Sequence, residues 1–376
     1  MINCALFPTC GGCLYRNLDE HEYRRKKEEM LSVSVAKIKQ NHIVFGNSVF
    51  IADGTRRRAT MAFSVCKNQL LMGFNHFQSH EIADCRFCAL LSDKINRNLE
   101  NIYRLLSALC ATPFQIKKGK KVLSQKLSSG DIYICEVDNG IDIMLEIPFA
   151  LQLEHRLIIA EQINSYPDVI RLSYRRRMGE TPETVIEKTR PLIHNHGTDI
   201  YVPAGTFLQA SKAGEKALMD LVLKYIGDRQ GKIADLFCGV GTFSYPLAQN
   251  KNNHILAVDS SAELLSGFQV SVNQRQLNNI KIENRNLFKY PLDEKELENL
   301  DIVVFDPPRA GAAAQVAKLA KCDKSLVVIA VSCNPRTFVN DANTLISGGY
   351  TLKEMTMVDQ FVYSGHTELV AWFEKE

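Results

Sequence analysis

Residues 235–244 read Asp-Leu-Phe-Cys-Gly-Val-Gly-Thr-Phe-Ser, which is the pattern of a strand end, a glycine turn and a helix start. Glycines in such a turn allow positive φ angles and let the backbone approach a ligand closely. One strand later, residues 257–260 read Ala-Val-Asp-Ser, and an acid that ends a second strand can bind the two hydroxyls of a ribose. The two stretches predict a nucleotide-type pocket, although a glycine turn that binds no ligand would show the same sequence pattern.

The pattern around this pocket predicts the fold class. From about residue 201, strand-like segments alternate with helical ones; the strands are expected at residues 233–237, 254–259, 280–283, 301–306, 325–331, 352–358 and 368–373. Such alternation is typical of right-handed crossovers and a doubly wound parallel sheet. We therefore expect an α/β, Rossmann-like domain at residues 201–376, with ligands at the carboxyl ends of its strands. No third glycine completes G-x-G-x-x-G behind Gly241, which disfavours NAD.

Composition excludes several classes of protein. The 376 residues are 45% hydrophobic, which suits two globular domains and excludes disordered and collagen-like chains. No apolar run reaches the ~18 residues of a membrane span. The N-terminal residues lack the pattern of a signal peptide. We therefore expect a cytoplasmic protein with no membrane partner.

Charge is distributed unevenly along the chain. Residues 1–200 carry 27 Lys and Arg against 22 Asp and Glu, whereas residues 201–376 carry 18 against 20. The basic excess of the first part favours a polyanionic partner, or it is a solvated surface.

Two further segments precede the α/β domain. Residues 1–50 begin with a cysteine- and glycine-rich loop, and a charged helical pattern follows at about residues 18–39. Residues 51–200 are richer in strands, and residues 59–65 and 69–74 are spaced as a hairpin with Lys67 and Asn68 near the turn. We therefore expect three parts: residues 1–50, a β-rich domain at residues 51–200, and the α/β domain.

Three chemically active side chains lie at the ends of expected strands. Asp306 follows an apolar strand, and the two prolines after it stiffen the loop that holds its carboxylate. Cys333 also follows a strand; it is either a small buried residue or, if the loop lowers its pKa, a nucleophilic thiolate. Glu368 begins an apolar strand, where it is either solvated or held as a general base.

Together these segments resemble the S-adenosylmethionine-dependent RNA uracil-C5 methyltransferases. The resemblance lies in Phe-Leu-Gln at 207–209, Asp-Leu-Phe-Cys-Gly-Val-Gly at 235–241, Asp-Pro-Pro-Arg-Ala-Gly at 306–311, Ser-Cys-Asn-Pro at 332–335 and His-Thr-Glu-Leu-Val at 366–370. These motifs have the order and spacing of the family. The resemblance extends to the N-terminal cysteines and is weakest over about residues 90–200.

The resemblance implies a covalent mechanism. Addition of the Cys333 thiolate to C6 of uracil makes C5 nucleophilic toward the methyl group of S-adenosylmethionine, and Glu368 matches the base that removes the C5 proton. Gln209 and Asp306 are similar to residues that position cofactor and uracil. The residues that match the cofactor pocket are Gln209, Phe237, Gly239, Asp259, Asn286 and Asp306, with Asp259 at the ribose and Asn286 near the adenine.

The dense N-terminal cysteines indicate a metal site. Cys10-x2-Cys13 with Cys85-x2-Cys88 could form a zinc-ribbon-like tetrad, although the 71 residues between the pairs exceed the usual spacing. The pattern of Cys4, Cys10, Cys13 and Cys85 resembles instead the iron–sulfur branch of the family, which implies a [4Fe-4S] cluster with four thiolate ligands. Cys88 would then be an incidental thiol, and the cluster would support folding of the RNA-binding part.

The resemblance also implies an RNA partner. Arg56, Arg57 and Arg58 run directly into a strand where a family relative would contact RNA, so we expect them to bind phosphates, against the alternative of a solvated face. Base access requires the target uridine to be extruded from its stack.

The order of the segments suggests a substrate. The chain begins at the cysteines, which resembles the branch that methylates uridine 747 of 23S ribosomal RNA. The alternatives are uridine 54 of transfer RNA, a non-catalytic RNA-binding protein with the same fold, and a zinc-ribbon binding module. We expect the protein to act as a monomer.

Overall fold

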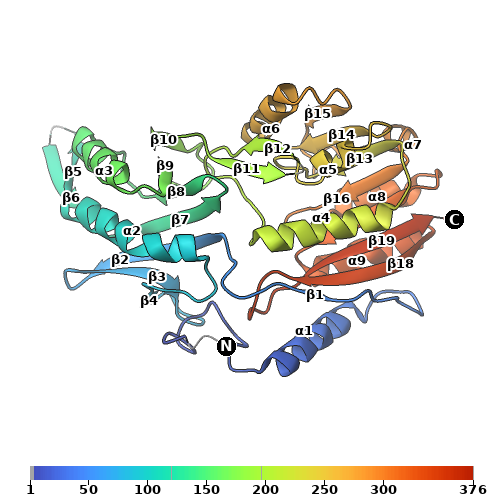
Figure 1. Cartoon of the computed structure of the whole chain (residues 1–376), viewed down its shortest axis with the longest axis horizontal. Helices are drawn as coiled ribbons and strands as arrows, with labels where there is room; N and C mark the ends of the chain where they lie inside the picture. Colours follow the sequence, from blue (N-terminus) through green and yellow to red (C-terminus); the bar gives the residue numbers. More distant parts are fainter. Residues whose placement is uncertain (1–3, 120, 196, 376) are drawn as a thin grey trace. The chain divides into compact units, whose positions relative to one another are not determined.

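The computed structural model describes residues 4–119, 121–195 and 197–375, and the chain forms two compact units (Figure 1). Unit 1 comprises residues 1–16, 52–193 and 202–211, and unit 2 comprises residues 17–51, 194–201 and 212–376. The observed division differs from the expected three parts, because residues 1–50 are shared between the units at Arg16 and Asn17.

Unit 2 is built around an eight-stranded sheet. In spatial order its strands are β1 (Val49–Phe50), β18 (Tyr350–Asp359), β19 (Glu368–Lys375), β17 (Val327–Ser332), β16 (Ile302–Phe305), β13 (Lys232–Leu236), β14 (His254–Asp259) and β15 (Ile280–Asn284). The described parts of the seven expected strands are therefore all present. The expected fully parallel sheet is wrong in one respect: β19 pairs antiparallel with both β17 and β18. A short loop joins β18 to β19, and parallel strands would have needed a long crossover.

Helices cover both faces of this sheet (Figure 1). They are α1 (Glu20–Val35), α4 (Lys212–Ile226), α5 (Ser244–Ala248), α6 (Ala262–Gln274), α7 (Glu294–Glu298), α8 (Ala313–Lys321) and α9 (Pro335–Ser347). One apolar core joins α1, α8 and α9 to the sheet, and α4 packs on β17, β18 and β19 outside that core. This doubly wound arrangement brings the loops after the parallel strands to one edge of the sheet.

Helix α1 is anchored to the C-terminal hairpin by a buried polar network. The ammonium group of Lys27 lies 2.9 Å from the Asp359 carboxylate, and neither side chain is accessible to solvent to a significant extent. Lys27 also donates to the backbone oxygens of Ser364 and His366. The hydroxyl of Tyr23 donates to Asp359 and accepts from the amide of Tyr363 at 2.8 Å. The network therefore fixes both ends of the loop between β18 and β19.

Unit 1 has two layers. Its seven-stranded sheet has the order β10 (Glu183–Glu187), β9 (Val169–Arg175), β8 (Gly140–Glu146), β7 (Ser129–Val137), β2 (Arg58–Cys66), β3 (Gln69–Asn75) and β4 (Ile82–Asp84). Helices α2 (Asp93–Ala111) and α3 (Leu153–Ser165) pack with the sheet in one apolar core. The expected hairpin is confirmed, because β2 pairs with β3 and both Lys67 and Asn68 have positive φ, as a tight two-residue turn requires.

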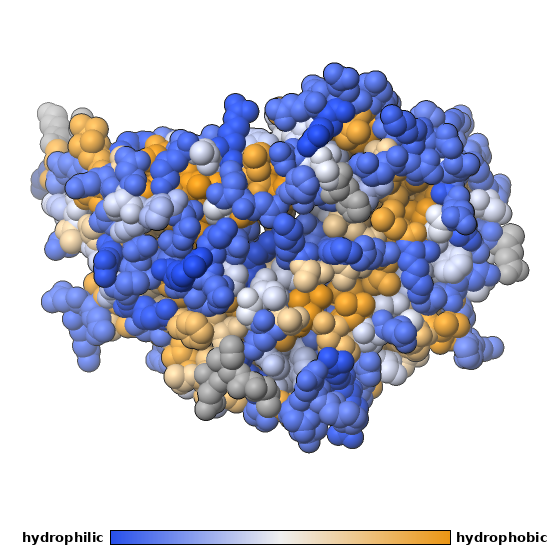
Figure 2. Space-filling view, viewed as in Figure 1, coloured by the Kyte–Doolittle hydropathy of each residue, from blue (hydrophilic) through white to orange (hydrophobic). Residues whose placement is uncertain are grey.

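Two small hairpins complete the fold. They are formed by β5 (Pro113–Lys118) with β6 (Lys121–Lys126), and by β11 (Leu192–Asn195) with β12 (Thr198–Tyr201). Within the described residues, every helix is too short or too polar to span a lipid bilayer. Hydrophilic residues dominate the face of the molecule shown in Figure 2.

We expect Lys27→Met to lower the free energy of unfolding by about 3–5 kcal/mol, because it leaves the Asp359 carboxylate buried without its counter-charge. Urea denaturation measures the change. Lys26→Met is the matched control, since the Lys26 side chain is 44% exposed and forms an ion pair with the exposed Glu29. The double variant Lys27→Met/Asp359→Asn should recover part of the loss; a single Lys27→Met variant as stable as the wild type would contradict the assignment.

Candidate active site

One edge of the sheet in unit 2 collects most of the predicted site residues. Strands β16, β17, β13 and β14 end there, and β19 begins there because it runs antiparallel to β17. Along this edge the sheet order places, from one side to the other, Glu368, Cys333, Asp306, Phe237, Asp259 and the segment of Asn286. The expected base, Glu368, and the expected nucleophile, Cys333, therefore lie at one end of this row, and most of the expected cofactor residues lie at the other end.

Cys333 and Glu368 are neighbours across β17 and β19. Ser332 pairs with Leu369 in the ladder, so the next positions of the two antiparallel strands are Cys333 and Glu368. Burial, with smaller contributions from the Glu368 and Asp306 carboxylates, raises the pKa of the Cys333 thiol to about 11, whereas Arg309 acts in the opposite direction. The thiol is therefore protonated at neutral pH in the free protein.

Glu368 is held in a nearly dry environment. Its side chain is 2% exposed, and Nε2 of Gln360 donates a hydrogen bond to its carboxylate. Burial raises the pKa of Glu368 to about 8; the charge of Asp306 raises it and the hydrogen bond from Gln360 lowers it. A carboxylic acid with a pKa near neutrality can exchange a proton under physiological conditions, as a general base must. Gln360 was not among the predicted residues, and no motif in the sequence marked it.

Arg309 links the loops that carry these groups. Its guanidinium lies 3.0 Å from Nδ1 of His366, and its backbone oxygen accepts a hydrogen bond of 2.9 Å from the side-chain amide of Asn334. The loops after β16 and β17 and the loop before β19 are thus tied together. The arrangement holds the Cys333 and Glu368 positions against one another.

The glycine loop after β13 has the backbone that the sequence predicted. Phe237, Gly239 and Gly241 all have positive φ, at 62°, 56° and 90°. An added Cβ at Gly241 would lie 2.6 Å from the ring of Phe268, whereas a Cβ at Gly239 would meet open space. Gly241 is therefore required for packing, and Gly239 leaves room beside the loop for a ligand.

Asp259 orients this loop. Its carboxylate accepts a hydrogen bond of 3.0 Å from the amide of Gly239 and one of 2.9 Å from the amide of Ser261. Beneath the loop Asp235 is fully buried and accepts a hydrogen bond of 2.5 Å from Ser244. Burial raises the pKa of Asp235 to about 7. Asp235 lay in the quoted motif, but the sequence had not distinguished it as a support of the loop.

An aromatic pair flanks the position of Asn286. The Asn286 side chain accepts from the amides of Phe288 and Lys289, so it shapes the turn after β15. The ring of Phe288 is 46% exposed and lies 5.5 Å, centroid to centroid, from the ring of Phe237. Phe237 is half-buried and Phe288 is exposed, so the two rings are able to stack against a planar group. Phe288 was missed in the sequence because a lone phenylalanine after a strand is typical of packing.

Gln209 and the arginine run belong to unit 1. The backbone oxygen of Gln209 accepts from Nε of Arg57 at 3.0 Å, and Arg57 is only 6% exposed. Arg58 donates to the backbone oxygen of Leu208 at 2.8 Å and lies over the Phe207 ring. Neither side chain is part of a freely solvated face. RNA binding by Arg56, Arg57 and Arg58 stays a prediction.

The cysteines predicted as ligands lie in unit 1. Burial, with smaller contributions from the Cys88 and Cys10 thiols, raises the pKa of Cys13 to about 11, whereas Arg16 acts in the opposite direction. The pKa of Cys10 is likewise raised by burial and by the thiols of Cys88 and Cys4, and the Cys85 side chain interacts with Cys88 and Cys10. Cys88, expected to be incidental, thus neighbours the predicted ligands. Within residues 4–119, 121–195 and 197–375, no three His, Cys, Asp or Glu side chains are arranged to hold a metal ion.

Comparison with known proteins gives consistent results. The family model described as tRNA (Uracil-5-)-methyltransferase matches residues 185–376. An uncharacterized RNA methyltransferase from Brucella melitensis is 35% identical over 373 residues, covering 99% of this chain and 84% of that protein. A 23S rRNA (uracil(1939)-C(5))-methyltransferase from Aliivibrio fischeri is 28% identical, covering 99% of this chain and 82% of that protein.

The fold is similar to that of a solved structure. This structure is the Pyrococcus abyssi tRNA (uracil-54, C5)-methyltransferase in complex with S-adenosyl-L-homocysteine, which aligns with a TM-score of 0.70 at 20% identity. The alignment covers 97% of this chain and 86% of that one.

We expect the burial of Glu368 to make stability fall as pH rises. Below about pH 4.5 both the folded and unfolded states are protonated at this residue; between there and about pH 8 only the unfolded state ionises, which favours unfolding. Glu368→Gln cannot ionise, so its free energy of unfolding should exceed that of the wild type by a margin that grows over this range, to on the order of a few kcal/mol. Urea denaturation from pH 5 to 9 measures the margin. A margin independent of pH would show that Glu368 titrates normally.

Proposed function

The chain belongs to the tRNA (uracil-5-)-methyltransferase family, and we propose that it methylates C5 of uridine 747 in 23S ribosomal RNA. It is an RNA uracil-C5 methyltransferase, and the finer proposal concerns the target. The adjacent positions of Cys333, after the last residue of β17, and Glu368, at the first residue of β19, support the assignment of these residues to the chemistry. The Aliivibrio fischeri relative is named for uridine 1939 and the Pyrococcus abyssi protein for uridine 54 of transfer RNA, so these uridines are the rival targets.

The proposed residue roles follow from the chemistry of uracil. C5 is a poor nucleophile until the Cys333 sulfur bonds to C6, which moves electron density to C5. S-adenosylmethionine, when bound, supplies an electrophilic methyl group. Glu368 then accepts the C5 proton, the C6–sulfur bond breaks, and the thiolate leaves as the C5–C6 double bond re-forms. The Cys333 thiol must first release its proton to water, and the Arg309 cation favours the thiolate that results.

The glycine loop supports binding of this cofactor. The open space beside Gly239, the nearby Asp259 carboxylate and the ring of Phe237 suit a nucleoside with ribose hydroxyls and a flat base. Asp306 lies between this pocket and Cys333 in the sheet order, which supports its proposed contact with uracil or cofactor. Gln209, in unit 1, keeps its proposed role on the resemblance of its motif alone.

The cysteines of unit 1 support a [4Fe-4S] cluster held by Cys4, Cys10, Cys13 and a fourth thiolate. The sequence pattern favours Cys85 as the fourth ligand. Cys88 is the alternative fourth ligand, because its thiol interacts with both Cys10 and Cys13. Thiolates are suitable ligands for iron–sulfur clusters, and the proposed methyl transfer needs no electron from one.

Mapping 5-methyluridine in ribosomal and transfer RNA from a deletion strain tests the target. We expect the modification to disappear at uridine 747 of 23S RNA and to return when the wild-type gene is supplied. Persistence of the modification at that uridine, with loss at uridine 1939 or at transfer RNA uridine 54, would assign the rival target.

We expect Cys333→Ala to abolish both methylation and covalent RNA adducts, because the first bond cannot form. Glu368→Gln keeps the size of the side chain and removes its basicity, so the adduct should form and resolve slowly. A denaturing gel with labelled RNA would then show crosslinked protein in the glutamine variant alone. Turnover at the wild-type rate by Glu368→Gln, or methylation by Cys333→Ala, would refute the proposed roles.

We expect protein purified without oxygen to contain about four iron and four sulfide per chain. Cys13→Ala should lose both, and comparison of Cys85→Ala with Cys88→Ala identifies the fourth ligand by which variant loses them. Cys66→Ala is the control, because Cys66 is exposed at the β2–β3 turn. Stoichiometric zinc without sulfide would eliminate the cluster.

A further inference from the structure

Unit 1 contains a hollow on the sheet face opposite its helices. The hollow has a volume of about 380 Å³, within the range of small-ligand pockets, and all its lining residues belong to unit 1. On β2 the residues Thr60 and Ala62 alternate with Ala59, Met61 and Phe63, which are buried in the core beneath α2 and α3. Since successive side chains of a strand point to opposite faces, the hollow lies on the face without helices.

One wall of the hollow is held by backbone hydrogen bonds. The amide of Gly11 donates to the backbone oxygen of Asn75 at 2.9 Å, and Cys10 forms a β-bridge with His76. The amide of Phe77 donates to the oxygen of Thr9 at 3.2 Å. The wall next to Gly11 and Gly12 thus has a fixed backbone and no side chains that would fill the space.

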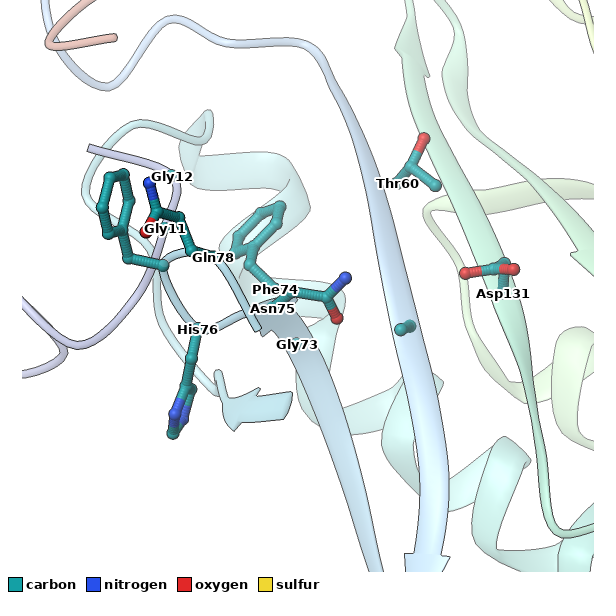
Figure 3. Close-up of a pocket in the computed structure, with 11 residues that line it drawn as sticks. Gly11, Gly12, Thr60, Gly73, Phe74, Asn75, His76, Gln78 and Asp131 are labelled. Carbon is teal, nitrogen blue, oxygen red and sulfur yellow. The ribbon is translucent and has the colours of Figure 1, made fainter. Parts of the chain in front are cut away.

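The side chains in the hollow combine an aromatic ring with polar groups. Phe77 is 54% exposed, and Asn75 and Gln78 present amides that can both donate and accept hydrogen bonds. Figure 3 shows the Asn75 amide pointing from β3 toward β2, with Asp131 on the next strand and His76 turned away from both. Burial raises the pKa of Asp131, and the charge of Glu146 raises it further, so Asp131 is a partly desolvated acceptor.

This chemistry selects among ligands. The described residues that line the hollow include a carboxylate and no lysine or arginine, so a phosphate group would be repelled there. A neutral planar ring with donors on its edge suits a stacking aromatic side chain, two amides and a carboxylate.

We propose that this hollow binds an unpaired nucleobase of the RNA substrate, stacked on Phe77 and hydrogen-bonded by Asn75 and Asp131. The proposal rests on the RNA substrate of the proposed function, and the lining of the hollow, which belongs wholly to unit 1, includes none of the residues proposed to bind the cofactor or the target uridine. Asp131 accepts a hydrogen bond from an exocyclic amino group, so the hollow prefers cytosine, adenine or guanine over uracil, whose one donor on the base edge is the ring N3–H.

The test measures binding of the full-length protein to fluorescein-labelled single-stranded decamers of cytidine, adenosine or uridine, by anisotropy. Phe77→Ala should weaken binding of all three about tenfold, the typical loss when a stacking side chain is removed. Asp131→Ala should weaken the cytidine and adenosine decamers and spare the uridine decamer, so that the preference disappears. Phe77 is exposed, so its variant should unfold at the wild-type temperature.

Leu157→Ala is the matched control, because Leu157 is 59% exposed on α3, over the opposite face of the sheet. It should bind every decamer as the wild type does. Affinities of Phe77→Ala and Asp131→Ala within twofold of the wild type would overturn the proposal, as would an equal loss in Leu157→Ala. The readout needs no methyl transfer, so it remains decisive even if the wild-type protein methylates none of the RNAs proposed as substrates.

Discussion

The antiparallel direction of β19 is the constraint on which the proposed chemistry depends. A parallel strand at this position would start at the far edge of the sheet, about 20 Å from the end of β17. Because β19 returns directly after β18, Glu368 at its first residue faces Cys333 after the last residue of β17. A thiol and a carboxylic acid that are 35 residues apart in sequence thereby share one solvent-poor position.

Burial then determines the charge state of this position. Asp306, Glu368 and Cys333 lie together, and each acidic group raises the pKa of the thiol or of Glu368 because like charges cannot all be stabilised in a dry site. Keeping these groups close together makes the free energy of folding less favourable. The buried Lys27–Asp359 pair holds the adjoining loop, so α1 supports the segment that leads to Glu368, the proposed base.

Local patterns in the sequence were sufficient to locate the glycine loop, Asp306 and Cys333, because each follows an apolar strand and strand ends of parallel sheets share an edge. The direction of β19 was predicted wrongly, since direction depends on the strand's spatial partners. Gln360 could not be recognised because its hydrogen bond to Glu368 depends on how the β18–β19 loop folds back on itself. The hollow of unit 1 could not be predicted from the sequence either, because four separate chain segments meet to form it. The burial of Arg57 could not be recognised either, because a run of arginines carries no sign of the backbone oxygen of Gln209 that Arg57 binds in the fold.

The attachment of residues 17–51 to unit 2 has a consequence for the order of events during synthesis. Helix α1 packs on α9 and β18, and β1 pairs with β18, so this early segment has no partner until roughly 300 later residues have been made. At 5–20 residues per second, the ribosome takes roughly 15–60 s to supply them. During that interval Leu31, Val35 and Ile38, which are buried in the finished core, are exposed on the nascent chain. We therefore expect chaperones at the tunnel exit to bind the emerging polypeptide, and truncated chains that lack β18 keep these three apolar side chains exposed.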